Sequence, residues 1–228
     1  MPMAPPRKPG RPRDDSLAAR RREEILDIAA QCFAQNGYAN TDVQEVANIL
    51  GVGKGTVYRY FPSKRELFLK AVDRGMERLR ARVEADVADL QDPLAIFTRA
   101  IRSYLAFFES YPELTELFIQ ERAAFKDRDK PVYFQYREAH IGPWQDLQKR
   151  LIAAGRLRPL PIERLTVIYD LLYGLMFTNH FARQGKSAAT QAEDFLDIVF
   201  YGILGEVERR QSDHTVRSGP RESCPPSD

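Results

Sequence analysis

Cysteine and histidine are both scarce in this chain of 228 residues. The two cysteines, Cys32 and Cys224, lie in unrelated sequence contexts, so the sequence predicts neither a disulfide framework nor a metal site. The three histidines are scattered along the chain, and no Ser/His/Asp arrangement or pair of catalytic carboxylates stands out. We therefore expect a protein that is not an enzyme and that uses no cofactor and no metal.

Long apolar runs are also missing. No stretch reaches the roughly 18 to 20 apolar residues that are needed to cross a bilayer. The basic N-terminus is not followed by an apolar segment, so no secretory signal is predicted. The hydrophobic fraction of 43% and the charged fraction of 29% are ordinary for a chain that buries a core. We expect a cytoplasmic protein without a membrane partner.

Positive charge is concentrated at the front of the chain. Residues 1–65 carry 11 Lys and Arg against 7 Asp and Glu, whereas the remainder carries 23 against 25. A basic front on a near-neutral body is typical of a module that binds a polyanion, although a solvated basic tail has the same composition. Residues 1–19 are expected to form a flexible basic arm, because proline, glycine and charge dominate its first part.

Part of this arm resembles the core of an AT-hook. Proline and glycine keep such a segment extended, so that Arg7, Arg11 and Arg13 could enter a narrow minor groove, where A·T tracts concentrate negative potential. A nonspecific basic tail is the alternative interpretation. Under the first interpretation, these arginines are expected to contact the DNA.

Apolar residues recur at spacings of three and four along most of the chain, which predicts an all-α fold of about nine helices. The expected helices span about residues 16–36, 43–50, 54–60, 64–88, 92–110, 112–126, 132–154, 162–183 and 190–210. The first helices should form a three-helix DNA-binding domain, and the remaining ones a larger C-terminal helical domain. The expected divisions are an arm (1–19), a DNA-binding domain (20–80), the larger domain (81–211) and a disordered tail (212–228).

The stretch from Thr41 to Tyr60 is the most informative. Residues 41–44 match a capping box, Gly51-Val52-Gly53 separates two short helices, and Pro62 ends the second. Two short helices joined by a turn with glycine are the layout of a helix-turn-helix, whose second helix lies in the major groove. The residues expected to reach phosphates or base edges are Thr41, Lys54, Gly55, Thr56, Tyr58, Arg59, Tyr60 and Lys64.

Two apolar residues of the same stretch, Val57 and Phe61, should face the core instead. The glycine-rich turn also has a superficial likeness to a phosphate-binding loop. That loop needs a preceding strand and a lysine followed directly by Ser or Thr, whereas a helix precedes Lys54 and Gly55 follows it. Nucleotide hydrolysis is therefore not expected.

Residues 20–80 resemble the DNA-binding domain of the tetracycline-repressor (TetR) family. The resemblance rests on residues 25–30 with Phe33, on Asn36-Gly37-Tyr38, Thr41 and Val46-Ala47, and on the run from Gly51 to Lys64. Gly53 departs from the pattern, because the family often has serine there, and this puts one hydroxyl contact in doubt. The rest of the chain resembles the family only in its architecture, a larger helical domain that ends in two apolar helices.

The larger domain contains many aromatic residues at helical spacing, most of which should fill its core. A minority could line a cavity for an apolar or aromatic ligand. The residues proposed for this cavity are Tyr104, Phe108, Phe118, Trp144, Tyr173 and Phe177. The resemblance further implies that the last two helices pair with their copies in a four-helix dimer interface. The residues proposed for this interface are Leu165, Ile168, Leu172, Phe195, Ile198 and Val199.

These features together predict a homodimeric DNA-binding repressor that a small-molecule effector of unknown identity releases from double-stranded operator DNA. Release would follow from a shift between two states that the ligand binds with different affinity. An activator on the same fold is one alternative. The others are an enzyme or carrier with a vestigial DNA-binding domain and an architectural DNA-binding protein without a ligand.

Overall fold

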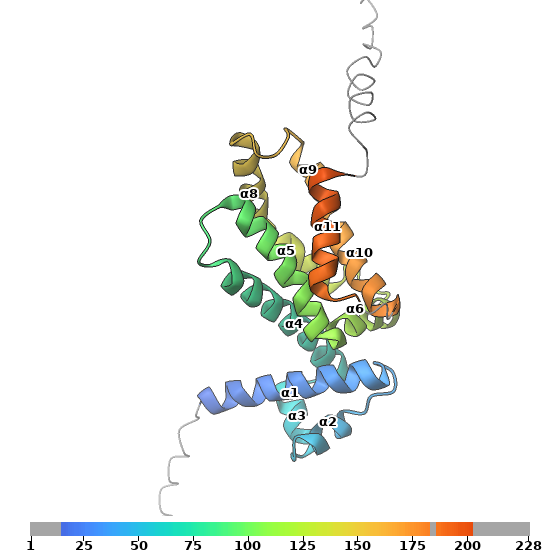
Figure 1. The fold of residues 1–228 in the computed structure, drawn as a ribbon. Helices are drawn as coiled ribbons and strands as arrows, with labels where there is room; N and C mark the ends of the chain where they lie inside the picture. The colour runs from blue at the N-terminus through green and yellow to red at the C-terminus, as the bar shows by residue number, and fades with distance from the viewer. Residues whose placement is uncertain (1–14, 183–185, 203–228) are drawn as a thin grey trace, which may run out of the picture.

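The computed structural model describes residues 15–182 and 186–202, and the regular elements of this part are all α-helices, as predicted (Figure 1). They are α1 (Asp15–Asn36), α2 (Val43–Ile49), α3 (Lys54–Tyr60), α4 (Lys64–Val87), α5 (Pro93–Ser110), α6 (Pro112–Ala124), α7 (Val132–His140), α8 (Gly142–Ala153), α9 (Ile162–Leu165), α10 (Val167–Ala182) and α11 (Ala188–Tyr201). In this described part, no helix is long and apolar enough to span a membrane.

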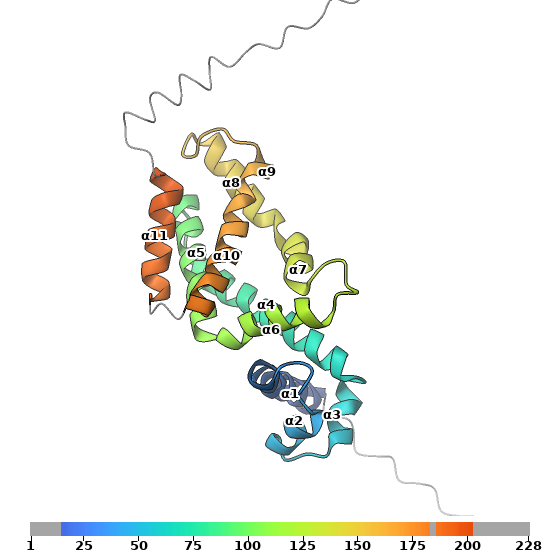
Figure 2. The same ribbon diagram turned by 90° about the vertical axis from the view of Figure 1, so that its right-hand side faces the viewer.

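The helices form a small unit and a larger one that share α4. Helices α1, α2 and α3 lie together at one end, and α4 leads from them into the larger unit built by α5 to α11 (Figures 1 and 2). Two details differ from the divisions expected above. Residues 15–19, which we assigned to a flexible arm, belong to α1, and the boundary expected at residue 80 falls inside α4. The arm before residue 15 lies outside the described residues.

One buried apolar cluster connects the two units. It includes Ile25 of α1, Val46 of α2, Val57 of α3, Phe68 of α4 and Phe118 of α6. Within it, a group of aromatic rings lies where the units meet: Phe33 is 5.0 Å from Phe68, Tyr38 is 5.2 Å from Phe68, and Tyr38 is 4.7 Å from Phe125, measured between ring centroids. Edge-to-face pairs of this kind contribute about 0.5–1.5 kcal/mol each beyond their buried area. The small unit is therefore packed firmly against the larger one.

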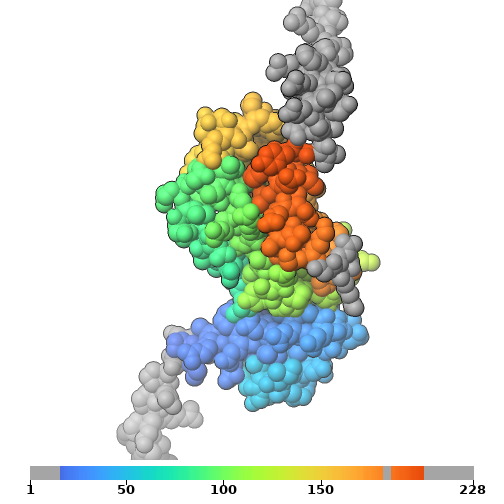
Figure 3. Space-filling model, viewed as in Figure 1, coloured from blue at the N-terminus to red at the C-terminus, as the bar shows by residue number. Residues whose placement is uncertain are grey.

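A second buried cluster holds the larger unit together at its other end. It is formed by Phe97 and Ile101 of α5, Leu147 of α8, Leu172 of α10 and residues of α11. Helix α11 lies along α5, and both are seen on the face shown in Figure 3. Both α5 and α10 contribute side chains to this cluster and to the first one, so these two helices connect the clusters.

Several predicted helix boundaries are confirmed by their capping contacts. The Ser63 hydroxyl accepts a hydrogen bond from the backbone N–H of Glu66, and Asp92 accepts one from the N–H of Ala95. Gly37 follows α1 with a φ of 80°, and Gly155 follows α8 with a φ of 66°. This left-handed backbone suits glycine, which has no Cβ to clash with the neighbouring carbonyl.

Two of the long helices predicted from periodicity are each divided in the structure. The helix expected over 132–154 is broken at Ile141 into α7 and α8, because Pro143 has no N–H to continue the ladder of hydrogen bonds. The helix expected over 162–183 is broken at Thr166, whose hydroxyl donates to the carbonyl of Glu163 at 2.6 Å. The last expected helix is described as far as Tyr201, and the predicted tail lies outside the described residues.

Candidate nucleic-acid interface and effector cavity

Helix α3 is held against the small unit by two apolar side chains. Val57 is 0% exposed and Phe61 is 1% exposed, as expected from their spacing. The turn before α3 is closed by Gly51, with a φ of 64°, and by a hydrogen bond of 2.9 Å from the N–H of Val52 to the carbonyl of Ala47. The remaining residues of α3 therefore lie on its outer side or at its edges, with Tyr58 38% exposed.

The first residue of α3 is tied to the start of α2. The Lys54 Nζ lies 2.6 Å from Asp42 Oδ1, and the same carboxylate oxygen accepts the N–H of Gln44 at 2.8 Å. The hydrogen bond from Gln44 contributes most to keeping the pKa of Asp42 below its ordinary value, and the one from Lys54 acts in the same direction. The hydrogen bond from Lys54 to Asp42 also raises the pKa of Lys54. Sequence reasoning missed Asp42 as a partner of Lys54, because the two residues are twelve positions apart.

Thr41 was predicted to cap α2 and to contact a phosphate, and the structure corrects both statements. The N-cap of α2 is Asp42. Thr41 is only 2% exposed, and its hydroxyl lies 3.2 Å from the carbonyl oxygen of Cys32 and 2.8 Å from that of Gly37. The hydroxyl proton is thus used inside the protein, and Thr41 fastens the end of α1 to the start of α2.

Lys64 begins α4 next to the α1–α2 connection. Its Nζ donates to the carbonyl of Ala39 at 2.9 Å and lies 5.0 Å from the centroid of the Tyr38 ring. Partial burial lowers the pKa of this ammonium group. Lys64 forms no ion pair with another residue of the described part of the chain, although the nearby charge of Asp42 partly offsets the lowering of its pKa.

The other predicted DNA-contacting residues differ in how they are placed. Gly55 and Arg59 are exposed, Thr56 is half-buried, and the Arg59 guanidinium lies 5.6 Å from the centroid of the Tyr60 ring. Tyr60 is half-buried and packs against the core of the small unit. Arg7, Arg11 and Arg13 lie outside the described residues.

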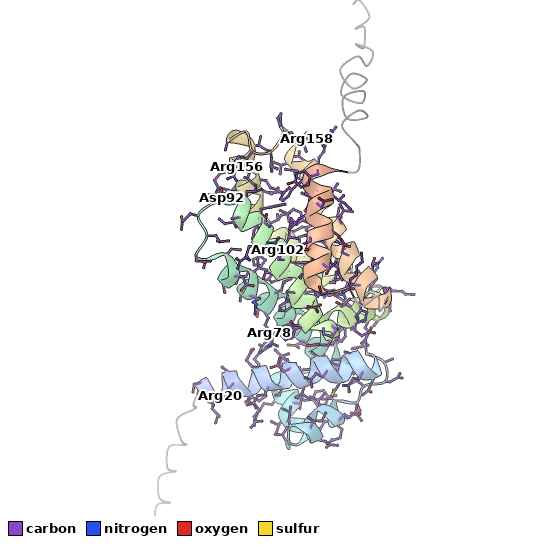
Figure 4. The ribbon with its side chains drawn as sticks, viewed as in Figure 1. Arg20, Arg78, Asp92, Arg102, Arg156 and Arg158 are labelled. Atoms are coloured by element: carbon purple, nitrogen blue, oxygen red, sulfur yellow. The ribbon has the colours of Figure 1, made fainter. Side chains whose placement is uncertain are left out.

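The small unit is joined to the larger one by polar contacts as well as by its core. Asp27 of α1 lies 2.8 Å from Arg74 and 2.9 Å from Arg78, both on α4, and Arg78 is labelled at this junction in Figure 4. The side chain of Gln120 on α6 donates to the carbonyl of Phe33 on α1 at 2.8 Å. A displacement of α4 or α6 would therefore move α1 with it.

A largely apolar cavity of about 520 Å³ lies in the larger unit. Its walls come from α4, α5, α7, α8 and α10, and include Met76, Leu79 and Val83 of α4. Of the six predicted cavity residues, Tyr104 and Trp144 line it. Phe108 and Phe177 belong to the main apolar cluster instead, while Phe118 and Tyr173 line a separate hollow of about 420 Å³ beside the loop before α7.

The helices of the predicted dimer interface do expose apolar side chains, but three of the six predicted interface residues are buried within the chain. Leu165, Leu172 and Phe195 are buried within the chain itself, Ile168 and Val199 are half-buried, and Ile198 is 55% exposed. The buried positions point into the larger unit, because each helix has one face for its own core. The large exposed apolar residues of α10 and α11 in the described part of the chain are Val167, Leu171, Phe181, Ile198 and Tyr201.

The geometry of α2 and α3 is that of a helix-turn-helix DNA-binding domain. Residues 25–71 match the profile of the bacterial regulatory proteins of the tetR family. These residues carry the DNA-binding domain of that family. Among the residues that the structure describes, no group of three or more His, Cys, Asp or Glu side chains could hold a metal ion.

The relatives of this chain include regulators of different kinds. It is 31% identical over 126 residues to the nucleoid occlusion factor SlmA of Aliivibrio fischeri, a match that covers 55% of this chain and 59% of that protein, less than two thirds of its length. It is 27% identical over 191 residues to the transcriptional repressor KstR of Rhodococcus jostii, covering 83% of this chain and 85% of that one.

The fold is shared with solved structures of low sequence identity. One is the transcriptional regulator FadR of Bacillus subtilis in complex with stearoyl-CoA, with a TM-score of 0.66, 19% identity, and coverage of 80% of this chain and 99% of that one. At this level of identity, the likeness establishes the helical architecture only.

Proposed function

We propose that this protein is a sequence-specific regulator of transcription whose α3 enters the major groove of operator DNA. The observation that carries the proposal is the presentation of α3: Val57 and Phe61 anchor it, while Lys54, Gly55 and Tyr58 remain at its accessible side. An exposed short helix braced by a second one is the arrangement that reads base edges in the major groove. Lys64, at the start of α4, is placed to bind an adjacent phosphate.

The protein acts as a homodimer in this proposal, because one short recognition helix offers little contact area. The exposed apolar side chains of α10 and α11, among them Leu171 and Ile198, supply the interface, and a groove of about 310 Å³ between these helices can receive side chains of the partner. A two-fold pair would place its two copies of α3 about one helical turn apart, roughly 34–36 Å.

An effector in the cavity of about 520 Å³ would release the DNA. The cavity is bounded by Leu79 and Val83 of α4, and α4 also carries Arg74 and Arg78, which hold α1. A ligand that fits only one position of α4 therefore shifts the spacing of the recognition helices, with a coupling of about 1–3 kcal/mol. The names of the relatives support repression and a ligand with a hydrocarbon chain, since KstR is a repressor and FadR was solved with stearoyl-CoA.

Selection of bound DNA from a random pool by the full chain tests the proposal. We expect enrichment of a pseudo-palindrome with half-sites one helical turn apart. Lys54→Ala should weaken binding and reduce the slope of log affinity against log salt by about 0.9 for each phosphate that is no longer neutralised. Lys149→Ala, an exposed lysine of α8, is the matched control and should change neither. Failure of the full chain to enrich any sequence at low salt would exclude the proposed function.

The basic arm and the dimer face have separate tests. Deletion of residues 1–13 should weaken operator binding and flatten its salt dependence, and an unchanged slope would contradict a phosphate role for the arm.

Ile198→Asp should yield monomers in sedimentation experiments, because it places a charge in the proposed interface. Ile49→Asp, at an exposed isoleucine of α2, is the control for the added charge and should leave the dimer intact.

A further inference from the structure

The charged side chains around the effector cavity are not balanced. Three arginines, one glutamate and one histidine line it, beside a predominance of apolar side chains. Arg80 lies 2.9 Å from Glu84, and Arg137 lies 2.7 Å from Asp170, so these two guanidinium groups are paired. Arg150 of α8, by contrast, forms no ion pair with any residue in the ranges 15–182 and 186–202. Within these ranges, the cavity thus has an exposed cation that lacks a counter-charge.

Several polar groups of the cavity lining already form hydrogen bonds with the protein. The hydroxyls of Tyr104 and Tyr133 lie 3.2 Å apart, and both side chains line the cavity. The Arg80 Nε donates to the Tyr136 hydroxyl at 3.0 Å, and the Nδ1 of His140 lies 2.8 Å from the Tyr136 carbonyl oxygen. A ligand segment that offers no hydrogen bonds can therefore enter without leaving these groups unpaired.

The tyrosines of the cavity do not supply a negative charge that could pair with Arg150. Burial raises the pKa of Tyr104 well above its ordinary value and raises the pKa of Tyr169 to about 12, so both phenols stay neutral at physiological pH. The remaining walls are aliphatic or aromatic and include Leu79 and Val83 of α4, Ile101 of α5, Leu147 of α8 and Leu172 of α10. The inner surface suits a hydrocarbon, and Arg150, an exposed residue of the lining, suits a negative group.

We propose that the effector is an amphipathic anion, a hydrocarbon segment that fills the cavity and ends in a carboxylate or similar acid held by Arg150. This inference rests on the proposed function, because it names the chemical class of that effector. A guanidinium offers a planar pair of N–H donors that matches a carboxylate, and such charge-assisted hydrogen bonds are stronger than neutral ones.

The sequence provides its own reporter for the test. Trp144 is the only tryptophan in the chain and lines the cavity, so its fluorescence responds to an occupant. The full chain is titrated with dodecanoate, dodecanol and dodecylamine, below their micelle concentrations. These probes share one hydrocarbon and differ in head-group charge. We expect dodecanoate to bind about tenfold more tightly than dodecanol, and dodecylamine to bind most weakly.

The arginine is tested by a matched pair of variants. Arg150→Gln should weaken dodecanoate binding about tenfold and leave dodecanol binding unchanged. Arg158→Gln, an exposed arginine outside the cavity lining that is labelled in Figure 4, should alter neither. Equal binding of the three probes to the unmodified protein, or an undiminished preference for dodecanoate in Arg150→Gln, would overturn the proposal.

Operator binding measured on the same samples separates this inference from the function it rests on. A protein that binds the selected DNA but ignores all three probes overturns the effector class and leaves the regulator intact. A protein that prefers dodecanoate but binds no DNA supports the anion site and overturns the proposed function. If the proposed function and the effector class are both correct, dodecanoate should release the selected DNA. Dodecylamine at the same concentration should leave the DNA bound.

Discussion

Substitution of Gly55 by alanine should affect the stability of the free protein and its affinity for operator DNA in different ways. Gly55 is the second residue of α3, and a Cβ added there meets no atom within 4 Å. Its φ is not in the left-handed region, so alanine can adopt the same backbone. Because alanine favours helix over glycine by up to about 1 kcal/mol, the free protein should be unchanged or slightly more stable.

The same methyl group should interfere when α3 lies against the DNA. An extra methyl at a closely packed surface costs typically about 1–3 kcal/mol, which corresponds to a decrease of about 5-fold to 150-fold in affinity. Operator affinity is measured by gel shift on the selected DNA, and stability by urea unfolding. Gly142→Ala is the matched control, since Gly142 begins α8, also has free space for a Cβ, and is remote from α3.

Unchanged operator affinity of Gly55→Ala would contradict the reasoning. If Gly55→Ala keeps full affinity for the selected DNA, the backbone of α3 does not approach the groove closely at this residue. The orientation proposed for the helix would then be wrong, even if the protein binds DNA through another surface.

Three further predictions concern residues whose roles the tertiary structure revealed. Asp42→Asn keeps an equally good N-cap but removes the charge beside Lys54. Because Asp42 then no longer competes with a DNA phosphate for Lys54, operator affinity should rise with little change in the urea midpoint of unfolding. A fall in affinity would contradict this competition. Thr41→Val should destabilise the fold by about 1–2 kcal/mol in urea unfolding, yet retain DNA affinity below its melting temperature, and a selective decrease in affinity would restore the phosphate role. Glu121 is 1% exposed, and burial raises its pKa above the ordinary value of 4.5, so its protonated form stabilises the fold and that contribution is lost as the pH rises through the folded-state pKa. Glu121→Gln should therefore gain stability relative to the unmodified protein as the pH rises above about 4, and identical pH profiles of the two unfolding free energies would refute this.

The sequence by itself determined the class of fold and the location of the DNA-binding element. Helix periodicity, capping residues and glycines act over a few positions, so Ser63, Asp92 and Gly37 could be assigned without a structure. The same local rules separated the anchoring residues Val57 and Phe61 from the rest of α3. Pro143 was also a usable local signal, and attention to it would have divided the helix predicted over 132–154.

The tertiary structure decided which residues of each helix meet. An aromatic stripe has the same sequence pattern whether it lines a cavity or fills a core, so only packing distinguished Tyr104 and Trp144 from Phe108 and Phe118. Likewise, the pairing of Lys54 with Asp42 and the position of Arg150 at the cavity depend on the placement of neighbouring helices. Periodicity states that a helix has an apolar face, whereas the angle at which helices pack determines what that face touches.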